Sequence, residues 1–305
     1  MGNPIGYTQE QTKDLQEQLN IAALVGFLPE KIVFVDSGNS ASTNGGTARN
    51  DALPTIDAAV GKCSANDGNV IYVMPGHAET ASTQVTMDVA GVTVLGAGVG
   101  RSRPAITANA SAVDLFNVTA ANCKLMNLRL VGAASSTALL NLAATDFSAE
   151  NCVFEHGAAP LQAVTVASGS SRFSFTNCRW VGTADGPDTA LIVEASSVDE
   201  WVIRDCDFNY GTFGCDLGCI LSSKRNSGYI IDRCVFVGMD TVAIDFNSSS
   251  SANCDGIISN CDIAMGADTA NIDTAIDAGG SGIVNTFGTD NPDSAGSRIP
   301  VQTPA

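Results

Sequence analysis

The sequence predicts an all-β solenoid preceded by one α-helix, and three observations predict this fold. First, five segments share the pattern apolar, any residue, Asn/Asp/Arg, Cys, any residue, apolar. Second, their cysteines, Cys152, Cys178, Cys206, Cys234 and Cys261, are spaced by 26, 28, 28 and 27 residues. Third, a second apolar run precedes each copy, and Gly, Ser, Asn and Asp separate the runs. A repeat of this length that contains short strands is typical of one coil of a solenoid.

The repeat copies account for most of the chain. Two degenerate copies precede the five that contain cysteine. In these two copies Leu128 and Ala97 occupy the position of the cysteine, so we expect at least seven coils. Apolar residues alternate within a copy, which indicates a strand with one buried face. The second apolar runs, at 138–140, 163–166, 190–193, 219–221, 242–244 and 274–276, predict one or two further strands per coil.

The segment before the first coil predicts an α-helix over residues 8–26. Thr8 and Gln11 form a capping box, Leu15, Leu19 and Ala22 follow on one helical face, and Pro29 ends the helix. The helix either caps the open end of the solenoid or is an anchoring arm that packs against a neighbouring subunit. We therefore divide the chain into an N-terminal helical arm or cap (1–30), a β-helix (31–281) and a polar C-terminal tail (282–305).

Composition limits the partners. The 305 residues carry 15 Lys and Arg against 32 Asp and Glu, a net charge of −17, and only five of the basic residues are Lys, so we expect no nucleic-acid partner. No run approaches the roughly 18 apolar residues that span a bilayer, and no basic segment opens the chain, so neither a membrane nor a secretory signal is expected. Hydrophobic residues make up 45% and aromatic residues 6%, which predicts a core of small and β-branched side chains.

Residues 31–38, 53–60 and 70–76 resemble the first coil, with its short capping helix, of the right-handed parallel β-helix (pectin-lyase-like) superfamily. The resemblance covers residues 31 to 280 and implies that the solenoid is a right-handed parallel β-helix. That family contains lyases, hydrolases, adhesins and non-enzymatic viral proteins, so the resemblance leaves the function open.

The repeated cysteines predict a column of buried, reduced thiols, because a thiol is a good small hydrophobic group. Adjacent coils bring such residues close, but their identical side-chain directions do not favour the torsion of a disulfide. Cys215 and Cys219 lack a second pair of ligands, so we expect no metal site and no cofactor. Free thiols in turn imply folding in a reducing compartment.

Charged residues occupy matching positions one coil apart. Arg179 matches Asp207, Arg204 matches Asp232, and Asp205 matches Arg233. These pairs predict ion pairs between coils, whose main contribution is to the register because exposed pairs are worth only about 0–1 kcal/mol each.

The same carboxylates are the best candidates for catalysis, since enzymes of the resembled family use clustered carboxylates. The candidates are Asp205, Asp207, Asp232, Asp240 and Asp245. Because several have an Arg one coil away, we assign no catalytic residue. If the protein is an enzyme, Asp205, Asp207 and Asp232 are the residues to test.

Other motifs are weaker. Polygalacturonases carry Gly-His-Gly, whereas His156 stands between Glu155 and Gly157, and His77 follows Pro-Gly as a turn residue. Residues 96–100 are glycine-rich but lack the Lys of a phosphate-binding loop, so we expect a turn. Calcium could bind at Asp185, Asp188 and Asp268.

Resemblance and elimination together favour a structural protein of a bacteriophage virion, either a capsid decoration (cement) protein or a surface spike, without catalytic activity. We expect a homotrimer that folds in the host cytoplasm and is located in the virion, with other virion proteins and a surface glycan as partners. The alternatives are a tailspike-like polysaccharide depolymerase, acting as a lyase or hydrolase, and a glycan-binding adhesin.

Overall fold

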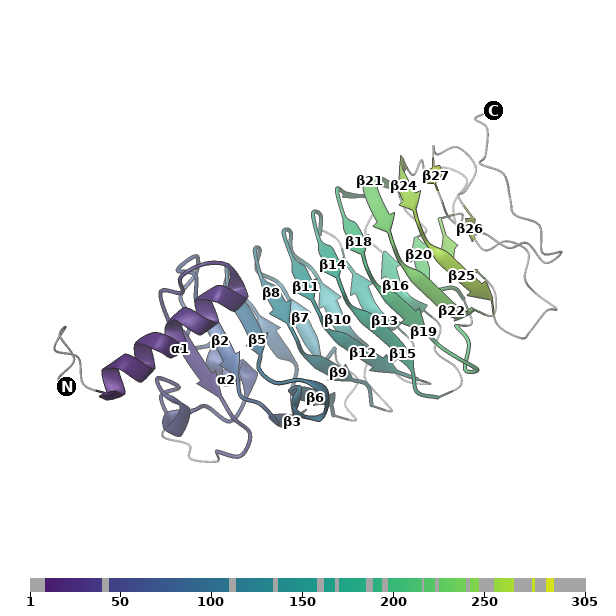
Figure 1. The fold of residues 1–305 in the computed structure, drawn as a ribbon. Coiled ribbons are helices and arrows are strands. Elements are labelled where there is room, and N and C mark those ends of the chain that lie inside the picture. Colours follow the sequence, from purple (N-terminus) through teal and green to yellow (C-terminus); the bar gives the residue numbers. More distant parts are fainter. Residues whose placement is uncertain are drawn as a thin grey trace.

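The computed structural model describes residues 9–39, 44–109, 114–133, 137–157, 162–167, 170–184, 189–193, 197–215, 217–222, 225–239, 242–246, 255–265, 276–277 and 284–287. In this part of the chain the strands form three parallel sheets of 11, eight and eight strands, which run side by side along the solenoid (Figure 1). The fold is therefore the predicted parallel β-solenoid with a short N-terminal helix.

Most coils contribute one strand to each sheet. The first sheet has the order β1 (Ile32–Val35), β2 (Val70–Val73), β5 (Thr93–Gly96), β8 (Lys124–Met126), β11 (Ser148–Glu150), β14 (Ser174–Thr176), β18 (Val202–Arg204), β21 (Arg225–Asp232), β24 (Asp255–Ser259) and β27 (Val284–Phe287), and β17 (Ser197–Asp199) also pairs with β21. The second sheet contains β3 (Ala78–Ala81), β6 (Ala105–Ala108), β9 (Arg129–Val131), β12 (Val153–His156), β15 (Arg179–Gly182), β19 (Asp207–Asn209), β22 (Val235–Met239) and β25 (Asp262–Met265).

The third sheet includes the second apolar runs and two earlier strands that were not predicted. It contains β4 (Val85–Met87), β7 (Phe116–Val118), β10 (Ala138–Leu142), β13 (Gln162–Val166), β16 (Thr189–Val193), β20 (Ile220–Ser222), β23 (Ile244–Asp245) and β26 (Ile276–Asp277). The register confirms the predicted repeat: Ser148 pairs with Ser174, Ser174 with Val202, and Val202 with Ile230. The offsets of 26, 28 and 28 residues equal the spacings of the cysteines.

The repeated motif is not one strand, as its alternation had suggested, but two strands in different sheets. In one copy β11 ends at Glu150 and β12 begins at Val153, and Asn151 between them has a φ of 53°. Ala149 and Cys152 are both buried, so two consecutive residues lie outside between them and the alternation is broken. The corresponding residues of the other copies are also left-handed: Asn127, Asn177, Asp205, Arg233 and Asn260. Asn tolerates this conformation well, which explains its frequency at the bend.

Asparagine side chains stabilise this bend in the early coils. The Asn127 amide donates hydrogen bonds to the carbonyls of Gly96 (2.8 Å) and Gly98 (2.9 Å). The Asn151 amide donates in turn to Asn127 Oδ1 at 2.9 Å. In later coils the charged residues Asp205 and Arg233 occupy the same position.

The core contains the predicted thiol column and also stacks of aromatic rings, which the composition did not predict. The five repeat cysteines are buried, and Cys152 Sγ donates to the carbonyl of Leu125 in the preceding coil (3.6 Å). The nine cysteines described are free thiols, and the tenth, Cys254, lies outside the described residues. The expectation of a core built from small and β-branched side chains is wrong for the later coils.

The aromatic rings stack because the register places the same motif position of successive coils side by side. Phe154, Trp180, Phe208 and Phe236 form one column, with centroid distances of 4.8, 4.4 and 4.8 Å and near-parallel planes. Phe173, Trp201 and Tyr229 form a second column, at 5.5 and 5.1 Å. The chain has few aromatic residues, but those of the repeated motif lie inside the solenoid. Each of them buries a large apolar area there.

Two helices lie at the N-terminal end (Figure 1), with different roles. Helix α2 (Ile56–Val60) buries Ile56, Ala59 and Val60 in the main core, and the Thr55 hydroxyl caps it by accepting from the Ala58 N–H. The short capping helix that the resemblance implied is thus present. The 3₁₀ helices η1 (Arg49–Asp51) and η2 (Gly100–Ser102) occupy loops.

Helix α1 (Gln9–Val25) lies on the outer face of the first sheet. Its buried residue is Ile21, which packs on Val70, Leu95 and Met126, with Val25 partly buried beside it. The predicted apolar face was wrong, because Leu19 is 50% exposed. The outer surface of the sheet accommodates only the narrow stripe of Ile21 and Val25, and Leu19 lies on the opposite side of the helix. Thr8 lies outside the described residues. Among those described, no helix combines the length and the apolar character that crossing a membrane requires.

The solenoid continues into the segment expected to be a polar tail. Strand β27, at residues 284–287, pairs with β24 in register, so the first sheet extends beyond residue 281. Strand β27 is short and does not belong to a recognisable copy of the repeated motif. The sequence pattern therefore did not predict it.

Candidate functional site

The carboxylates singled out from the sequence gather at the bend between the first and second sheets. We call Arg204, Asp205, Asp207, Asp232 and Arg233 the charged bend. The three predicted ion pairs between coils are confirmed: Arg179 to Asp207 at 3.0 Å, Arg204 to Asp232 at 3.3 Å, and Arg233 to Asp205 at 2.6 Å.

Asp232 is the central carboxylate of the charged bend and is 90% buried as a side chain, its exposed fraction being 10%. It accepts hydrogen bonds from Ser259 Oγ (2.8 Å) and Asn260 Nδ2 (3.1 Å) of the next coil, and from Arg233 (2.5 Å). Burial alone would raise the pKa of the Asp232 carboxyl, but the bonds from Asn260 and Ser259 and the nearby arginines lower it below its usual value. Asp232 is thus held as an anion by a full set of donors.

Asp205 is held in the same way. The Arg233 guanidinium binds it through two nitrogens, at 2.6 and 2.9 Å, and these bonds lower the pKa of the Asp205 carboxyl. General acid catalysis needs a carboxyl group that carries a proton near the working pH, and paired arginines oppose this. The geometry of the charged bend is that of a structural clamp between coils.

The other acidic candidates do not join this cluster. Asp245 lies on β23 in the third sheet, away from the bend between the first two sheets. Asp240 and the calcium candidates Asp185, Asp188 and Asp268 lie outside the described residues. Within the described ranges, no group of three or more His, Cys, Asp or Glu side chains is arranged to hold a metal ion.

Further ion pairs join neighbouring coils outside the charged bend, and we call all of these pairs together with the charged bend the ion-pair ladder. Lys124 pairs with Glu150 at 2.8 Å, Arg129 with Glu155 at 2.6 Å, and Arg172 with Asp146 at 2.6 Å. Each joins residues of neighbouring coils. The ladder therefore uses many of the 15 basic residues of the chain to fix the register between coils.

The ladder predicts a loss of stability in acid. Hydrogen bonds from Arg172 lower the pKa of the Asp146 carboxyl to about 2, and Asp205 and Asp232 are also lowered. Carboxyls with a lower pKa in the folded state contribute stability above their unfolded pKa of about 4, and lose it as the pH falls toward 2. We expect the melting temperature to be flat from pH 7 to about 5 and to fall below about pH 4. Asp146→Asn should make that fall shallower; an equal slope in the variant would contradict this assignment.

Sequence reasoning missed one constellation, at the first coil. His77 and Glu79 are buried, and His77 Nε2 lies 3.1 Å from Glu79 Oε2. His77 Nδ1 accepts from the Ser37 N–H (2.8 Å), and Glu79 also accepts from the Ile56 N–H at the start of α2 (3.1 Å). Ser37, His77 and Glu79 lie together here. The backbone N–H of Ser37 occupies His77 Nδ1, so this nitrogen is not free to accept a proton from the Ser37 hydroxyl. The group ties β1, β3 and α2 together.

Both histidines are structural in this arrangement. The His77 N–H closes a turn onto the Met74 carbonyl (3.1 Å), which confirms the predicted turn position. His156 is buried, and its Nε2 lies 2.7 Å from the hydroxyl of Tyr210. Burial near Cys215 and Cys219 raises the pKa of Tyr210 well above its usual value, so this hydroxyl stays protonated. The glycine-rich segment 96–100 connects the last residue of β5 to the first residue of η2, and Gly98 within it has a φ of 97°.

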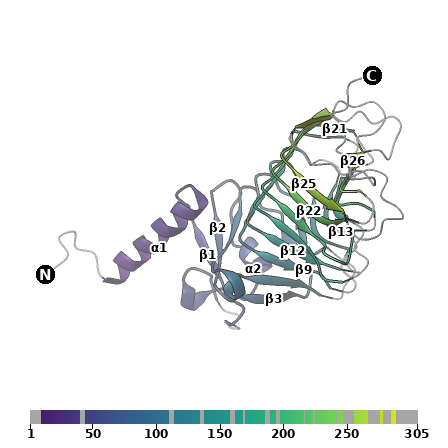
Figure 2. The ribbon, with the colours of Figure 1, turned by 45° about the vertical axis from the view of Figure 1, so that its right-hand side comes forward.

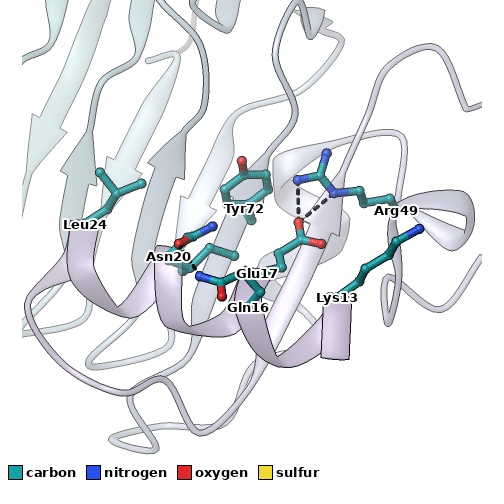
Figure 3. A pocket seen from close by; sticks show the side chains of 8 residues that line it. Lys13, Gln16, Glu17, Asn20, Leu24, Arg49 and Tyr72 are labelled. Atoms are coloured by element: carbon teal, nitrogen blue, oxygen red, sulfur yellow. Dashed lines mark hydrogen bonds and ion pairs between the residues drawn. The ribbon is translucent and has the colours of Figure 1, made fainter. Parts of the chain in front are cut away.

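A surface groove separates α1 from the first coil (Figure 3). Two hollows, of about 250 and 450 Å³, share Glu17 and Arg49 in their walls. The Arg49 guanidinium donates from Nε to Glu17 Oε1 at 2.6 Å and lies over the ring of Tyr72, 5.7 Å from its centroid. Among the described contacts, the Arg49–Glu17 ion pair and the burial of Ile21 hold α1 against the solenoid.

Comparison with known proteins identifies the fold and leaves the activity open. No protein-family model and no curated protein sequence matches the chain. Among solved structures, Escherichia coli YbhC has 13% identity and a TM-score of 0.53, over 86% of this chain and 84% of that one. Pectate lyase Pel9A has 14% identity and a TM-score of 0.50, over 85% and 76%. The ORF18 protein of Geobacillus virus E2 has 11% identity and a TM-score of 0.49, over 93% and 65%. At these identities the likeness shows the pectin-lyase-like parallel β-helix fold alone.

Proposed function

We propose that this pectin-lyase-like β-helix protein is a structural protein of a bacteriophage virion, where it decorates the capsid or forms a surface spike. The observation that carries the proposal is the charged bend. The carboxylates that would serve an enzyme of this fold, Asp205, Asp207 and Asp232, are each engaged by an arginine of an adjacent coil. These ion pairs join adjacent coils, which is a structural role.

The rest of the molecule supports the same role. The nine cysteines within the described ranges are free thiols, five of them in one buried column, which suits a chain that folds in the reducing host cytoplasm before it reaches the virion. The acidic surface, with a net charge of −17, keeps a strand-rich protein soluble at the high copy number of a virion component. In this proposal the protein is a homotrimer that contacts other virion proteins and, at its free surface, a host glycan.

The test has two parts. Mass spectrometry of purified virions should find the chain in many copies, and antibody labelling in electron micrographs should place it on the capsid or on the tail. In parallel, the pure protein is incubated with acidic and neutral bacterial polysaccharides. We expect no cleavage. Turnover that is lost in Asp207→Ala or Asp232→Ala, with the fold retained, would replace this proposal by a tailspike-like depolymerase.

A further inference from the structure

Cys215 and Cys219 form a pair of thiols apart from the column of five. Both are fully buried on the loop that joins β19 of the second sheet to β20 of the third. Figure 2 shows this side of the solenoid, with β12, β22 and β25 of the second sheet beside β13 and β26 of the third. The Cys215 thiol donates to the carbonyl of Gly218 at 3.4 Å, and its sulfur accepts a hydrogen bond from the Cys219 thiol. The two sulfurs are therefore in direct contact.

This contact differs from the contacts within the column. Column cysteines occupy matching positions of successive coils, so their Cβ atoms are about 4.8 Å apart, whereas the Cβ atoms of a disulfide are about 3.5–4.5 Å apart. Backbone hydrogen bonds hold the spacing of the column: the carbonyl of Cys178 accepts from the Asp207 N–H (3.0 Å), and the carbonyl of Cys206 accepts from the Val235 N–H (2.9 Å). We therefore expect the column thiols to stay reduced.

Cys215, in contrast, lies on a loop that can adjust toward a fixed partner. Cys219 is held by the neighbouring coil, because its carbonyl accepts from the N–H of Leu191 at 2.9 Å. The described residues between the end of β19 and the start of β20 form no strand, and they include Gly214, with a φ of 72°, and Gly218, with a φ of 123°. Glycine adopts both signs of φ at little cost, so small rotations at these two positions can bring the sulfurs to bonding distance.

The same loop controls the access of solutes to the pair. Phe213 is 36% exposed and Leu217 is 56% exposed, and they stand on either side of Cys215 in the chain. The buried pair thus lies directly beneath the surface. Local opening of such a loop costs less free energy than unfolding of the sheets, so a small solute reaches the sulfurs while the solenoid stays folded.

The two thiols have different roles in this contact. Burial raises the pKa of Cys219 well above its usual value, and the hydrogen bond with Cys215 raises it further. Cys219 therefore keeps its proton and shares it with the sulfur of Cys215. A donor at this sulfur stabilises negative charge there, so Cys215 is the thiol that reacts first.

We propose that Cys215 and Cys219 are a redox-active dithiol that closes to a disulfide by exchange with a low-molecular-weight disulfide of the glutathione type. Cys215 gives its proton to water, and its thiolate attacks one sulfur of the oxidant. The S–S bond of the oxidant breaks, one thiolate leaves, and a mixed disulfide remains on Cys215. Cys219 then loses its proton to the released thiolate and attacks the Cys215 sulfur. The second thiolate leaves and takes a proton from water, so the pair has given up two electrons and the oxidant has become two thiols.

This site goes beyond the proposed function and does not depend on it. Glutathione is kept largely reduced in a cytoplasm, whereas disulfides persist outside it. The pair is therefore open where the chain is made and closes when the protein meets an oxidising medium. Closure fixes Cys215 to Cys219, and hence the loop to the neighbouring coil. Failure of this proposal would leave the virion experiment unaffected.

The experiment treats the folded, full-length protein with glutathione disulfide at about pH 8, then denatures it and alkylates the remaining thiols with iodoacetamide. Trypsin releases residues 205–224, which contain Cys206, Cys215 and Cys219. We expect mass spectrometry to find this peptide with a single alkyl group, on Cys206, and with two hydrogens fewer in the remaining pair. Dithiothreitol before alkylation should restore alkylation of all the cysteines in the peptide. Circular dichroism should show the same fold before and after oxidation.

Two variants sharpen the assignment. Cys215→Ser removes the attacking thiol, so Cys206 and Cys219 should both be alkylated after the same treatment. Cys206→Ala is the matched control, because it removes a column thiol from the same peptide and should leave closure as complete as in wild type. Full alkylation of the oxidised wild-type peptide would overturn the proposal. A bond that includes Cys206, or glutathione that stays attached to Cys215 or Cys219, would overturn it as well.

Discussion

Trp180→Ala should destabilise the protein by about 3–5 kcal/mol, the largest effect that we expect from a single substitution. Trp180 is fully buried between Phe154 and Phe208, with centroid distances of 4.8 and 4.4 Å. Truncation removes its stacking contacts with both neighbours and leaves a cavity in the middle of the solenoid. The coils on either side prevent the surrounding side chains from filling that cavity. The midpoint of urea unfolding, followed by circular dichroism, measures the change.

Phe213→Ala is the control for this substitution. Phe213 is also a large aromatic residue of the later coils, but it is 36% exposed on a loop. Its truncation should lower the free energy of unfolding by only about 1–2 kcal/mol, because part of the ring is already in water. Similar costs for the two variants would mean that the aromatic columns do not stabilise the solenoid as described.

Asp232→Ala should have the second largest effect, about 2–3 kcal/mol. The substitution removes the acceptor for Ser259, Asn260 and Arg233, and takes away the nearest negative charge from Arg204. Because the carboxylate is 10% exposed, water replaces it poorly and its donors are left unsatisfied. Differential scanning calorimetry at pH 7 would measure the loss.

Asp207→Ala provides the comparison, since Asp207 belongs to the same charged bend but is 40% exposed and has Arg179 as its partner, which is 51% exposed. A pair this exposed is worth about 0–1 kcal/mol. A ranking in which Asp207→Ala costs more than Asp232→Ala would contradict the view that buried hydrogen bonds, rather than charge pairing alone, make the bend stable.

Residues at equivalent positions of neighbouring coils were predictable. Parallel strands in register place a residue beside the one that follows about 27 positions later, so the spacing of the cysteines sufficed to predict the thiol column. The same argument pairs Arg179 with Asp207 and Arg233 with Asp205 before any coordinates are known, and both pairs are present. It could also have predicted the aromatic columns, since Phe154, Trp180 and Phe208 share one motif position.

The bend inside the motif had a signal that was overlooked. Two consecutive outward residues, such as Glu150 and Asn151, cannot belong to one alternating strand, and the recurrence of Asn before Cys marks a left-handed residue. Reading both facts together would have divided the motif into two strands.

The sequence by itself determined the period and the partners between coils, because a solenoid repeats one local arrangement and its contacts follow from spacing. Only the tertiary structure decided the contacts between segments that are not related by the repeat. These include the side of α1 that packs on the first sheet, the meeting of Ser37 with His77 and Glu79, and the groove closed by Glu17 and Arg49. No periodicity connects such residues, so their approach depends on how the chain enters the first coil.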